Sequence, residues 1–163
     1  MIIRKAEQED ANKIAKIMVA SWQKNFKNIV PEEILQEMDS MKVSKAISSS
    51  IDNENVFVAE QNNEVVGFVG VGENRIKECP NWEAEIQAIH VDYDVKGSGI
   101  GTQLLEKAFT ELKNRNHRVV GLSVFENNPA NKFYKKLGGN LVEKRLKLMG
   151  GEKLNENLYE FQL

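Results

Sequence analysis

The segment DVKGSGIGTQLL places glycine at every second position just before a stretch with helical periodicity. Gly97, Gly99 and Gly101 permit backbone conformations and close approaches that a side chain would block. The first N–H groups of a helix have no partner within the helix and attract phosphate, and Lys96 adds a positive charge beside them. The segment therefore predicts a binding site for a phosphate or diphosphate, in preference to a turn that only reverses the chain.

Two common phosphate-binding motifs do not fit this segment. A Walker A loop requires a Gly-Lys pair, but Thr102 follows Gly101 and no such pair occurs there. The dinucleotide fingerprint requires glycine at position 102 and an acidic residue about 20 residues further on, where the sequence has RVVGLS. The predicted anion site is therefore of another kind.

The strand predicted before the glycines changes its alternation of apolar residues. Ala84, Ile86 and Ala88 follow one parity, whereas Ile89 and Val91 follow the other. A β-bulge between Ala88 and His90 would produce this change and leave backbone groups unpaired, and an imperfect pattern in a strand buried on both faces is the alternative. With a bulge, we expect free backbone groups beside the anion site, available to an extended ligand with amide groups.

The rest of the chain alternates strand and helix patterns in the order β-α-α-β-β-β-α-β-α-β-β. Two strands that flank Asn62-Asn63 predict a hairpin, because asparagine tolerates positive φ. Pro31, followed by Glu32 and Glu33, predicts the start of the second helix. Hairpins combined with crossovers predict an α/β fold with a mixed central sheet and helices on both faces, formed by one domain over residues 1–163.

Composition excludes several classes of protein. The 163 residues carry a net charge of −2, which argues against a partner such as nucleic acid or an anionic membrane that is bound by bulk charge. The single cysteine, Cys79, cannot form an internal disulfide or a Cys-rich zinc site, and no metal is expected. No segment approaches the ~18 apolar residues of a membrane helix, so we expect a soluble, cytoplasmic protein.

Two motifs resemble those of the GCN5-related N-acetyltransferase (GNAT) superfamily. The family's pyrophosphate loop, [QR]-x-x-G-x-[GA], is matched by KGSGIG at Gly99 and Gly101, although Lys96 replaces Gln or Arg. The second signature, N-x-x-A-x-x-F-Y-x-K-x-G, is matched at Asn127, Ala130, Phe133, Tyr134, Lys136 and Gly138. The two motifs lie about 30 residues apart in the family's order of elements, as expected for a member.

The resemblance implies acetyl-coenzyme A as the acetyl donor and a sheet splayed at the cofactor site. The pantetheine arm would pair with the backbone of Ile89, His90 and Val91, and Asn127 is a candidate either for a helix cap or for a ligand of this arm. The pyrophosphate would lie on the residues of the glycine loop, namely Lys96, Gly97, Ser98, Gly99, Ile100, Gly101 and Thr102.

The resemblance also implies an N-acetyltransferase that acts on a primary amine by direct attack in a ternary complex. Tyr134 matches the usual general acid, which protonates the leaving thiolate and also contacts the cofactor. Glu85 is the first candidate to accept the amine proton, directly or through water, with His90 as a weaker one. A non-catalytic acyl-coenzyme A sensor with the same fold is the alternative.

The acceptor is left open between a small molecule and a peptide. The resemblance implies that the region of Trp22 and Phe26 walls the acceptor pocket, although an aromatic pair at this spacing is also typical of a core. A basic run near the C-terminus either meets the 3′-phosphate of the cofactor or is solvated surface; it comprises Lys132, Lys135, Lys136, Lys144, Arg145 and Lys147. Either a monomer or a homodimer is consistent with the sequence.

Overall fold

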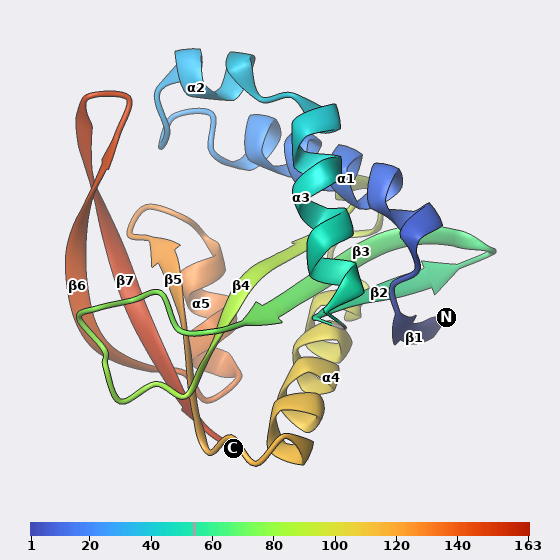
Figure 1. The fold of residues 1–163 in the computed structure, drawn as a ribbon. Helices are drawn as coiled ribbons and strands as arrows, with labels where there is room; N and C mark the ends of the chain where they lie inside the picture. The colour runs from blue at the N-terminus through green and yellow to red at the C-terminus, as the bar shows by residue number, and fades with distance from the viewer. Residues whose placement is uncertain (54) are drawn as a thin grey trace.

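The chain folds around one seven-stranded sheet, with helices on both faces (Figure 1). The computed structural model describes residues 1–53 and 55–163. The strands are β1 (Ile2–Lys5), β2 (Val56–Gln61), β3 (Glu64–Gly72), β4 (Ala84–Val91), β5 (Val119–Phe125), β6 (Asn140–Met149) and β7 (Glu152–Gln162). The helices are α1 (Ala11–Asn25), α2 (Glu32–Glu37), α3 (Ser40–Asp52), α4 (Ile100–Asn114) and α5 (Ala130–Lys136), with short 3-10 helices at Gln8–Asp10 and Tyr93–Val95.

The sheet is mixed, as the sequence predicted, with the order β1-β2-β3-β4-β5-β7-β6. The pair β4–β5 is parallel, and the other neighbouring pairs are antiparallel. Asn62 and Asn63 form the turn of the β2–β3 hairpin with φ values of 53° and 63°. The predicted hairpin is confirmed, because both residues adopt the positive φ that its two-residue turn requires.

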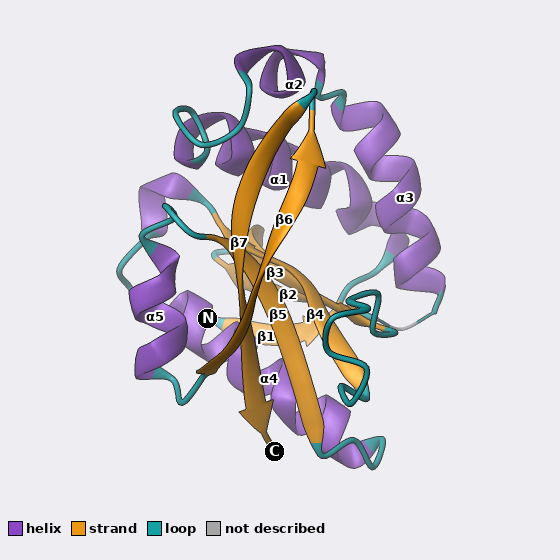
Figure 2. Cartoon of the chain, turned by 90° about the vertical axis from the view of Figure 1, so that its left-hand side faces the viewer, coloured by secondary structure: helices purple, strands orange, loops and turns teal. Residues whose placement is uncertain are grey.

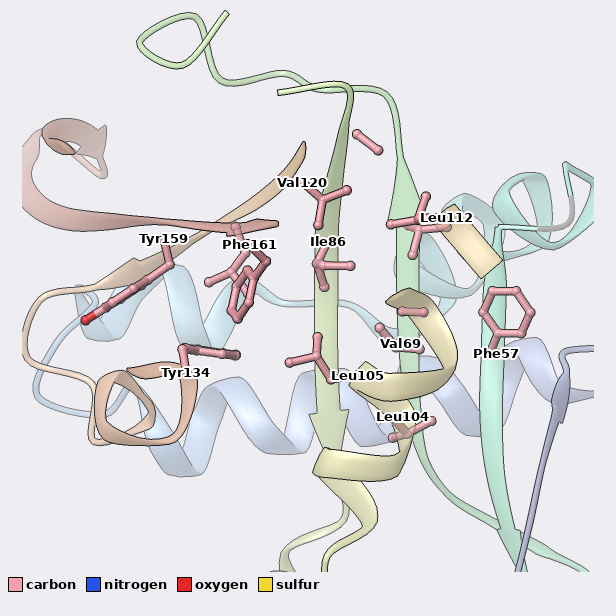
Figure 3. Packing of buried hydrophobic residues seen from close by; sticks show 14 of the residues in the cluster. Phe57, Val69, Ile86, Leu104, Leu105, Leu112, Val120, Tyr134, Tyr159 and Phe161 are labelled. Carbon is pink, nitrogen blue, oxygen red and sulfur yellow. The ribbon is translucent and has the colours of Figure 1, made fainter. Parts of the chain in front are cut away.

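The two faces of the sheet are covered by different helices. On one face, α4 buries Leu104, Leu105 and Leu112 against β2 to β5 and β7, together with Tyr134 of α5 (Figure 3). On the opposite face, Ile14 and Ile17 of α1 pack with residues of α3, β2 and β3. Because both faces are buried, β3 and β5 carry mainly apolar residues or glycine, whereas β4 also carries Glu85, Gln87 and His90.

The N-terminal helical region differs from the prediction in one respect. One helix was predicted from Pro31 onward, but the structure has two, α2 and α3, separated by Met38 and Asp39. Both residues have extended backbone conformations, and the Asp39 side chain accepts a hydrogen bond from the Met41 amide at 2.9 Å. The prediction missed this N-cap, which starts a second helix. In the described residues, no helix is both long and apolar enough to cross a membrane.

The long β6–β7 hairpin extends beyond the rest of the sheet toward α2 (Figure 2). Leu154 of β7 and Met149 of β6 pack against the apolar cluster of Phe26, Leu35 and Phe125. The hairpin therefore contacts the end of α1 and α2. This contact closes one side of the space that lies between β4 and β5, which pair only near their first residues.

Candidate functional site

A cavity of about 980 Å³ opens where the two halves of the sheet separate. Strands β4 and β5 pair only at Ala84–Val120 and Glu85–Gly121, so the facing edges of both strands lack strand pairing beyond this point. The cavity is lined by the end of α1, by β4 with the glycine loop, by the start of α4, by β5 and α5, and by single residues of the β3–β4 loop, β6 and β7. This arrangement gives a linear ligand with amide groups two strand edges to pair with.

The bulge predicted in β4 is confirmed, one residue earlier than expected. Ile86 and Ala88 pair with the consecutive residues Val71 and Gly70, which leaves Gln87 as the extra residue. Ala88 packs against the cluster under α1 and α3, whereas Ile86 and Ile89 pack against the cluster under α4. The small apolar side chain of Ala88 fits either face, and the sequence pattern therefore could not locate the bulge to one residue.

The glycine loop connects β4 to α4 and turns the start of the helix toward the cavity. Gly97 and Gly99 have φ values of 80° and 82°, in the left-handed region that favours glycine. No side chain caps α4, whose N-cap is Gly99. The N–H groups of Ile100, Gly101 and Thr102, which all line the cavity, have no partners within the helix and are available to an anion.

Most of the residues predicted to bind the cofactor line this cavity. They are Ile89, His90, Val91, Lys96, Gly97, Gly99, Ile100, Gly101, Thr102 and Tyr134. Ser98 is exposed outside the lining and donates its hydroxyl proton to the Val95 carbonyl at 2.6 Å. Asn127 is also exposed and outside it, and the predicted capping role was wrong by one residue, because Asn128 accepts the hydrogen bond from the Ala130 amide at 2.9 Å.

Tyr134 projects from α5 into the core cluster on the α4 face and also lines the cavity (Figure 3). Its side chain is buried, and desolvation raises the pKa of the phenol. The hydroxyl makes no hydrogen bond with any residue in the described part of the chain, in contrast to the nearby Tyr159, whose hydroxyl donates to Asn131 Oδ1 at 2.9 Å. Tyr134 therefore keeps its proton at neutral pH and is able to donate it to a ligand.

A chain of hydrogen bonds joins the glycine loop to His90. Lys96 Nζ donates to Asn25 Oδ1 at 2.6 Å, Asn25 Nδ2 donates to Ser21 Oγ at 2.8 Å, and Ser21 Oγ lies 2.9 Å from His90 Nδ1. If the Ser21 hydroxyl uses its own proton here, it donates to Nδ1, and the imidazole proton lies on Nε2. The sequence did not indicate Ser21 or Asn25, since neither belongs to a motif.

Desolvation in the cavity wall, followed by the charge of Lys96, lowers the pKa of His90 to about 4. At neutral pH the imidazole is therefore uncharged, and its Nδ1 is engaged with Ser21. Both features make His90 a poor acceptor for a proton from an ammonium group. The arrangement favours a role for His90 as a hydrogen-bonding group of the cavity wall.

The low pKa of His90 predicts a loss of stability in mild acid. An unfolded histidine binds a proton below about pH 6.5, whereas folded His90 does so only below about pH 4. Between these values the unfolded state binds more protons, so the free energy of unfolding falls as the pH falls, by about 2 kcal/mol at pH 5 from this group. We expect urea denaturation to show a smaller loss between pH 7 and pH 5 in His90→Gln, and an equal loss in both proteins would contradict the prediction.

Glu85 is buried beside the cavity and does not belong to its lining. Its carboxylate accepts hydrogen bonds from Arg75 Nε at 3.1 Å, from Arg75 Nη2 at 2.8 Å and from the Arg75 amide at 3.0 Å. Arg75 itself does line the cavity. The structure thus places a cation of the β3–β4 loop between the carboxylate and the cavity, and nothing in the sequence linked the two residues.

Trp22 and Phe26 pack in a core cluster, as their spacing suggested, and both also line the cavity, while their role as a wall of the acceptor pocket stays a prediction. Their ring centroids lie 4.8 Å apart, and Phe125 of β5 completes the cluster, with its centroid 5.3 Å from that of Phe26. The Nε1 atom of Trp22 is buried without a hydrogen-bond partner among the described residues. The cluster closes the side of the cavity formed by α1.

The residues of the basic run near the C-terminus lie in different environments. Lys136 and Lys147 line the cavity, whereas Lys144 pairs with Glu126 at 2.7 Å, and Arg145 Nε donates to Glu156 Oε2 at 2.7 Å. Glu156 of β7 is buried and lines the cavity, although no motif indicated it. Within the described part of the chain, no group of three or more His, Cys, Asp or Glu side chains could hold a metal ion.

Comparison with known proteins agrees with this geometry. The model of the acetyltransferase (GNAT) family matches residues 12–139, which cover both motifs and the whole lining of the cavity up to α5. The chain belongs to the acetyltransferase (GNAT) family. The resemblance expected from the two motifs is thereby confirmed, and so is the α/β fold with its mixed sheet.

Individual GNAT relatives extend this comparison. The chain is 31% identical to the uncharacterised N-acetyltransferase YuaI of Bacillus subtilis over 134 residues. The aligned segment covers 81% of this chain and 76% of that protein. It is 46% identical over 89 residues to an uncharacterised N-acetyltransferase of Methanocaldococcus jannaschii, covering 53% of this chain and 39% of the relative. The structure of YncA from Salmonella typhimurium with its cofactor acetyl-CoA superposes with a TM-score of 0.77 at 18% identity, over 100% and 94% of the two chains.

Proposed function

We propose that this GNAT protein transfers the acetyl group of acetyl-coenzyme A to a primary amine by direct attack. The observation that carries the proposal is the gap between β4 and β5, which joins the uncapped start of α4 to the unpaired hydroxyl of Tyr134. A binding site for a diphosphate at one end of the gap and a proton donor at the other end suit a thioester cofactor with a long amide-bearing arm. Acetyl-coenzyme A in YncA, a protein of the same fold, supports this choice.

In this proposal the cofactor lies along the edge of β4. The backbone of Ile89 to Val91 pairs with β3 on one side only, so its other edge is available to the pantetheine amides. The N–H groups of Ile100 to Thr102 donate hydrogen bonds to the diphosphate, and the positive φ of Gly97 and Gly99 gives the loop its shape. Lys96, now bonded to Asn25, lies beside this position and adds a positive charge.

The reaction needs an uncharged amine, which attacks the acetyl carbon of the thioester. A C–N bond forms, the C–S bond of the tetrahedral intermediate breaks, and the sulfur takes the phenolic proton of Tyr134. The amine gives up its protons to solvent, one of which restores Tyr134. Because both oxygens of Glu85 are bound to Arg75, we propose that Glu85 acts on the acceptor through Arg75, as a positioning residue.

A non-catalytic sensor with the same fold would not need a desolvated, unpaired phenol in the cavity. Tyr134 is buried, its pKa is raised and its hydroxyl lacks a partner among the described residues. A phenol that keeps its proton and has no partner in the folded protein is free to donate to a ligand, so these features serve a reaction better than simple binding. They favour the enzyme over the sensor.

A thermal shift tests the choice of cofactor. At 100 times its Kd, a ligand of the native state adds about 2.7 kcal/mol to the free energy of unfolding. A domain of this size gains roughly 2–4 °C of melting temperature per kcal/mol, so we expect acetyl-coenzyme A to raise it by several degrees. NAD and ATP, which lack the pantetheine arm, should have a much smaller effect, and a larger shift with either would refute the proposal.

A further inference from the structure

Three charged side chains line the cavity on the side away from the glycine loop. Arg75 comes from the β3–β4 loop, Lys147 from β6 and Glu156 from β7, and we call these three residues the charged wall. The β3–β4 loop and the two strands are joined by Arg145, whose Nε donates to Glu156 Oε2 at 2.7 Å and whose Nη1 lies 3.4 Å from Glu78 Oε2. The charged wall therefore belongs to one connected part of the structure.

Glu156 has one oxygen that the protein leaves without a hydrogen bond. Its side chain is 4% exposed, and Arg145 binds Oε2. Oε1 lies 3.7 Å from Lys147 Nζ, which is beyond hydrogen-bonding distance, and accepts no hydrogen bond from any residue in the described ranges. A carboxylate oxygen that lines a cavity and receives no hydrogen bond from the protein is open to a ligand, and an ammonium group of the acceptor would supply the donor there.

The two cations of the charged wall retain binding capacity. Arg75 uses Nε and Nη2 for Glu85, while Nη1 has no partner among the described residues. The side chains of Arg75 and Lys147 are 61% and 42% exposed, and both residues line the cavity. A guanidinium that is already oriented by a carboxylate and a lysine ammonium in the same cavity suit an acceptor carboxylate.

The overall charge of the cavity supports this assignment. The described lining contains one acidic residue, Glu156, and five lysine or arginine residues, which are Lys24, Arg75, Lys96, Lys136 and Lys147. A diphosphate on the glycine loop would account for Lys96, whereas Arg75 and Lys147 come from other elements of the lining. A polyamine or another polycation would be repelled by such a lining, whereas a ligand with one amine and one carboxylate would find both partners.

We propose that the acceptor is an amine that carries a carboxylate close by, as in an α-amino acid. Glu156 binds the ammonium group before it loses its proton, and Arg75 with Lys147 binds the carboxylate. The inference rests on the proposed acetyl transfer and adds the class of acceptor. It also explains why a buried carboxylate and two cations with unused donors face the same cavity.

Paired acceptors test this proposal. Thiol release from acetyl-coenzyme A is measured with a panel of L-amino acids, with their α-amides and with spermidine. The amides keep the amine and lose only the carboxylate, and their amines are less basic, which favours the amides chemically. We expect kcat/KM to be at least tenfold higher for the best acids than for their amides, which corresponds to about 1.4 kcal/mol.

Lys147→Met removes one cation and keeps most of the stem. It should raise KM for the acids about tenfold and leave the amides within twofold, since the amides make no bond to Lys147. Lys144→Met is the matched control, because Lys144 lies on the same strand, is 57% exposed and pairs with Glu126 outside the cavity. This variant should change neither series.

The outcomes separate the two proposals. Preference for amides or spermidine, or an equal loss in both series with Lys147→Met, overturns the charged acceptor while the acetyl transfer stands. No thiol release with any amine, in a protein that acetyl-coenzyme A still stabilises against heat, overturns the transferase and this inference together.

Discussion

Tyr134→Phe is expected to lower kcat by about 10²–10⁴ while acetyl-coenzyme A binds nearly as before. The phenol lines the cavity, its pKa is raised by desolvation and its hydroxyl makes no hydrogen bond to the described residues. The substitution therefore removes a proton donor without breaking a bond of the folded protein. Pre-steady-state thiol release and calorimetric titration with the cofactor would measure the two effects separately.

Tyr159→Phe is the matched control for this prediction. Tyr159 is fully buried on β7, with its ring centroid 6.2 Å from that of Tyr134, but its hydroxyl binds Asn131 and it does not line the cavity. We expect this variant to lose about 1 kcal/mol of stability, from one buried hydrogen bond, and to retain kcat. Unchanged chemistry in Tyr134→Phe, with the chemical step shown to limit the rate, would exclude Tyr134 as the acid.

Gly101→Val is expected to weaken binding of acetyl-coenzyme A about 10- to 100-fold in a protein that still folds. A Cβ at this position would lie 3.4 Å from Phe133 Cζ and 3.8 Å from Val91 Cγ2, which is ordinary contact, so the Cβ itself fits in the free protein. The added side chain would stand beside the N–H groups that face the diphosphate, and one charge-assisted hydrogen bond is worth about 1.5–3 kcal/mol. Calorimetric titration gives the Kd.

Position 101 is a better test than Gly97 or Gly99, whose positive φ would strain any side chain. Gln103→Val controls for a valine in the first turns of α4, because Gln103 is exposed and outside the cavity lining. It should bind the cofactor like the wild type. An unchanged Kd in Gly101→Val would place the diphosphate elsewhere, and unfolding without a separate binding defect would make Gly101 a structural residue.

Features that depend on neighbouring residues followed from the sequence alone. The Asn62-Asn63 hairpin, the seven strands and the bulge in β4 were predictable, because turn conformation and side-chain parity are local properties. The glycine loop and Tyr134 were found through motifs for the same reason, since each motif lies on one continuous segment. The boundary between α2 and α3 was missed because it depends on one N-cap, Asp39.

The partners of the site residues were decided only by the tertiary structure. Nothing in the sequence around Glu85 indicates that Arg75 binds both of its carboxylate oxygens. Likewise, nothing around His90 indicates that its Nδ1 forms a hydrogen bond with Ser21. Arg75, Lys147 and Glu156 come from a loop and two strands that meet only because β4 separates from β5 and the β6–β7 hairpin packs against α1 and α2. Local patterns determine which elements form, but the packing of distant elements determines which side chains face the same cavity.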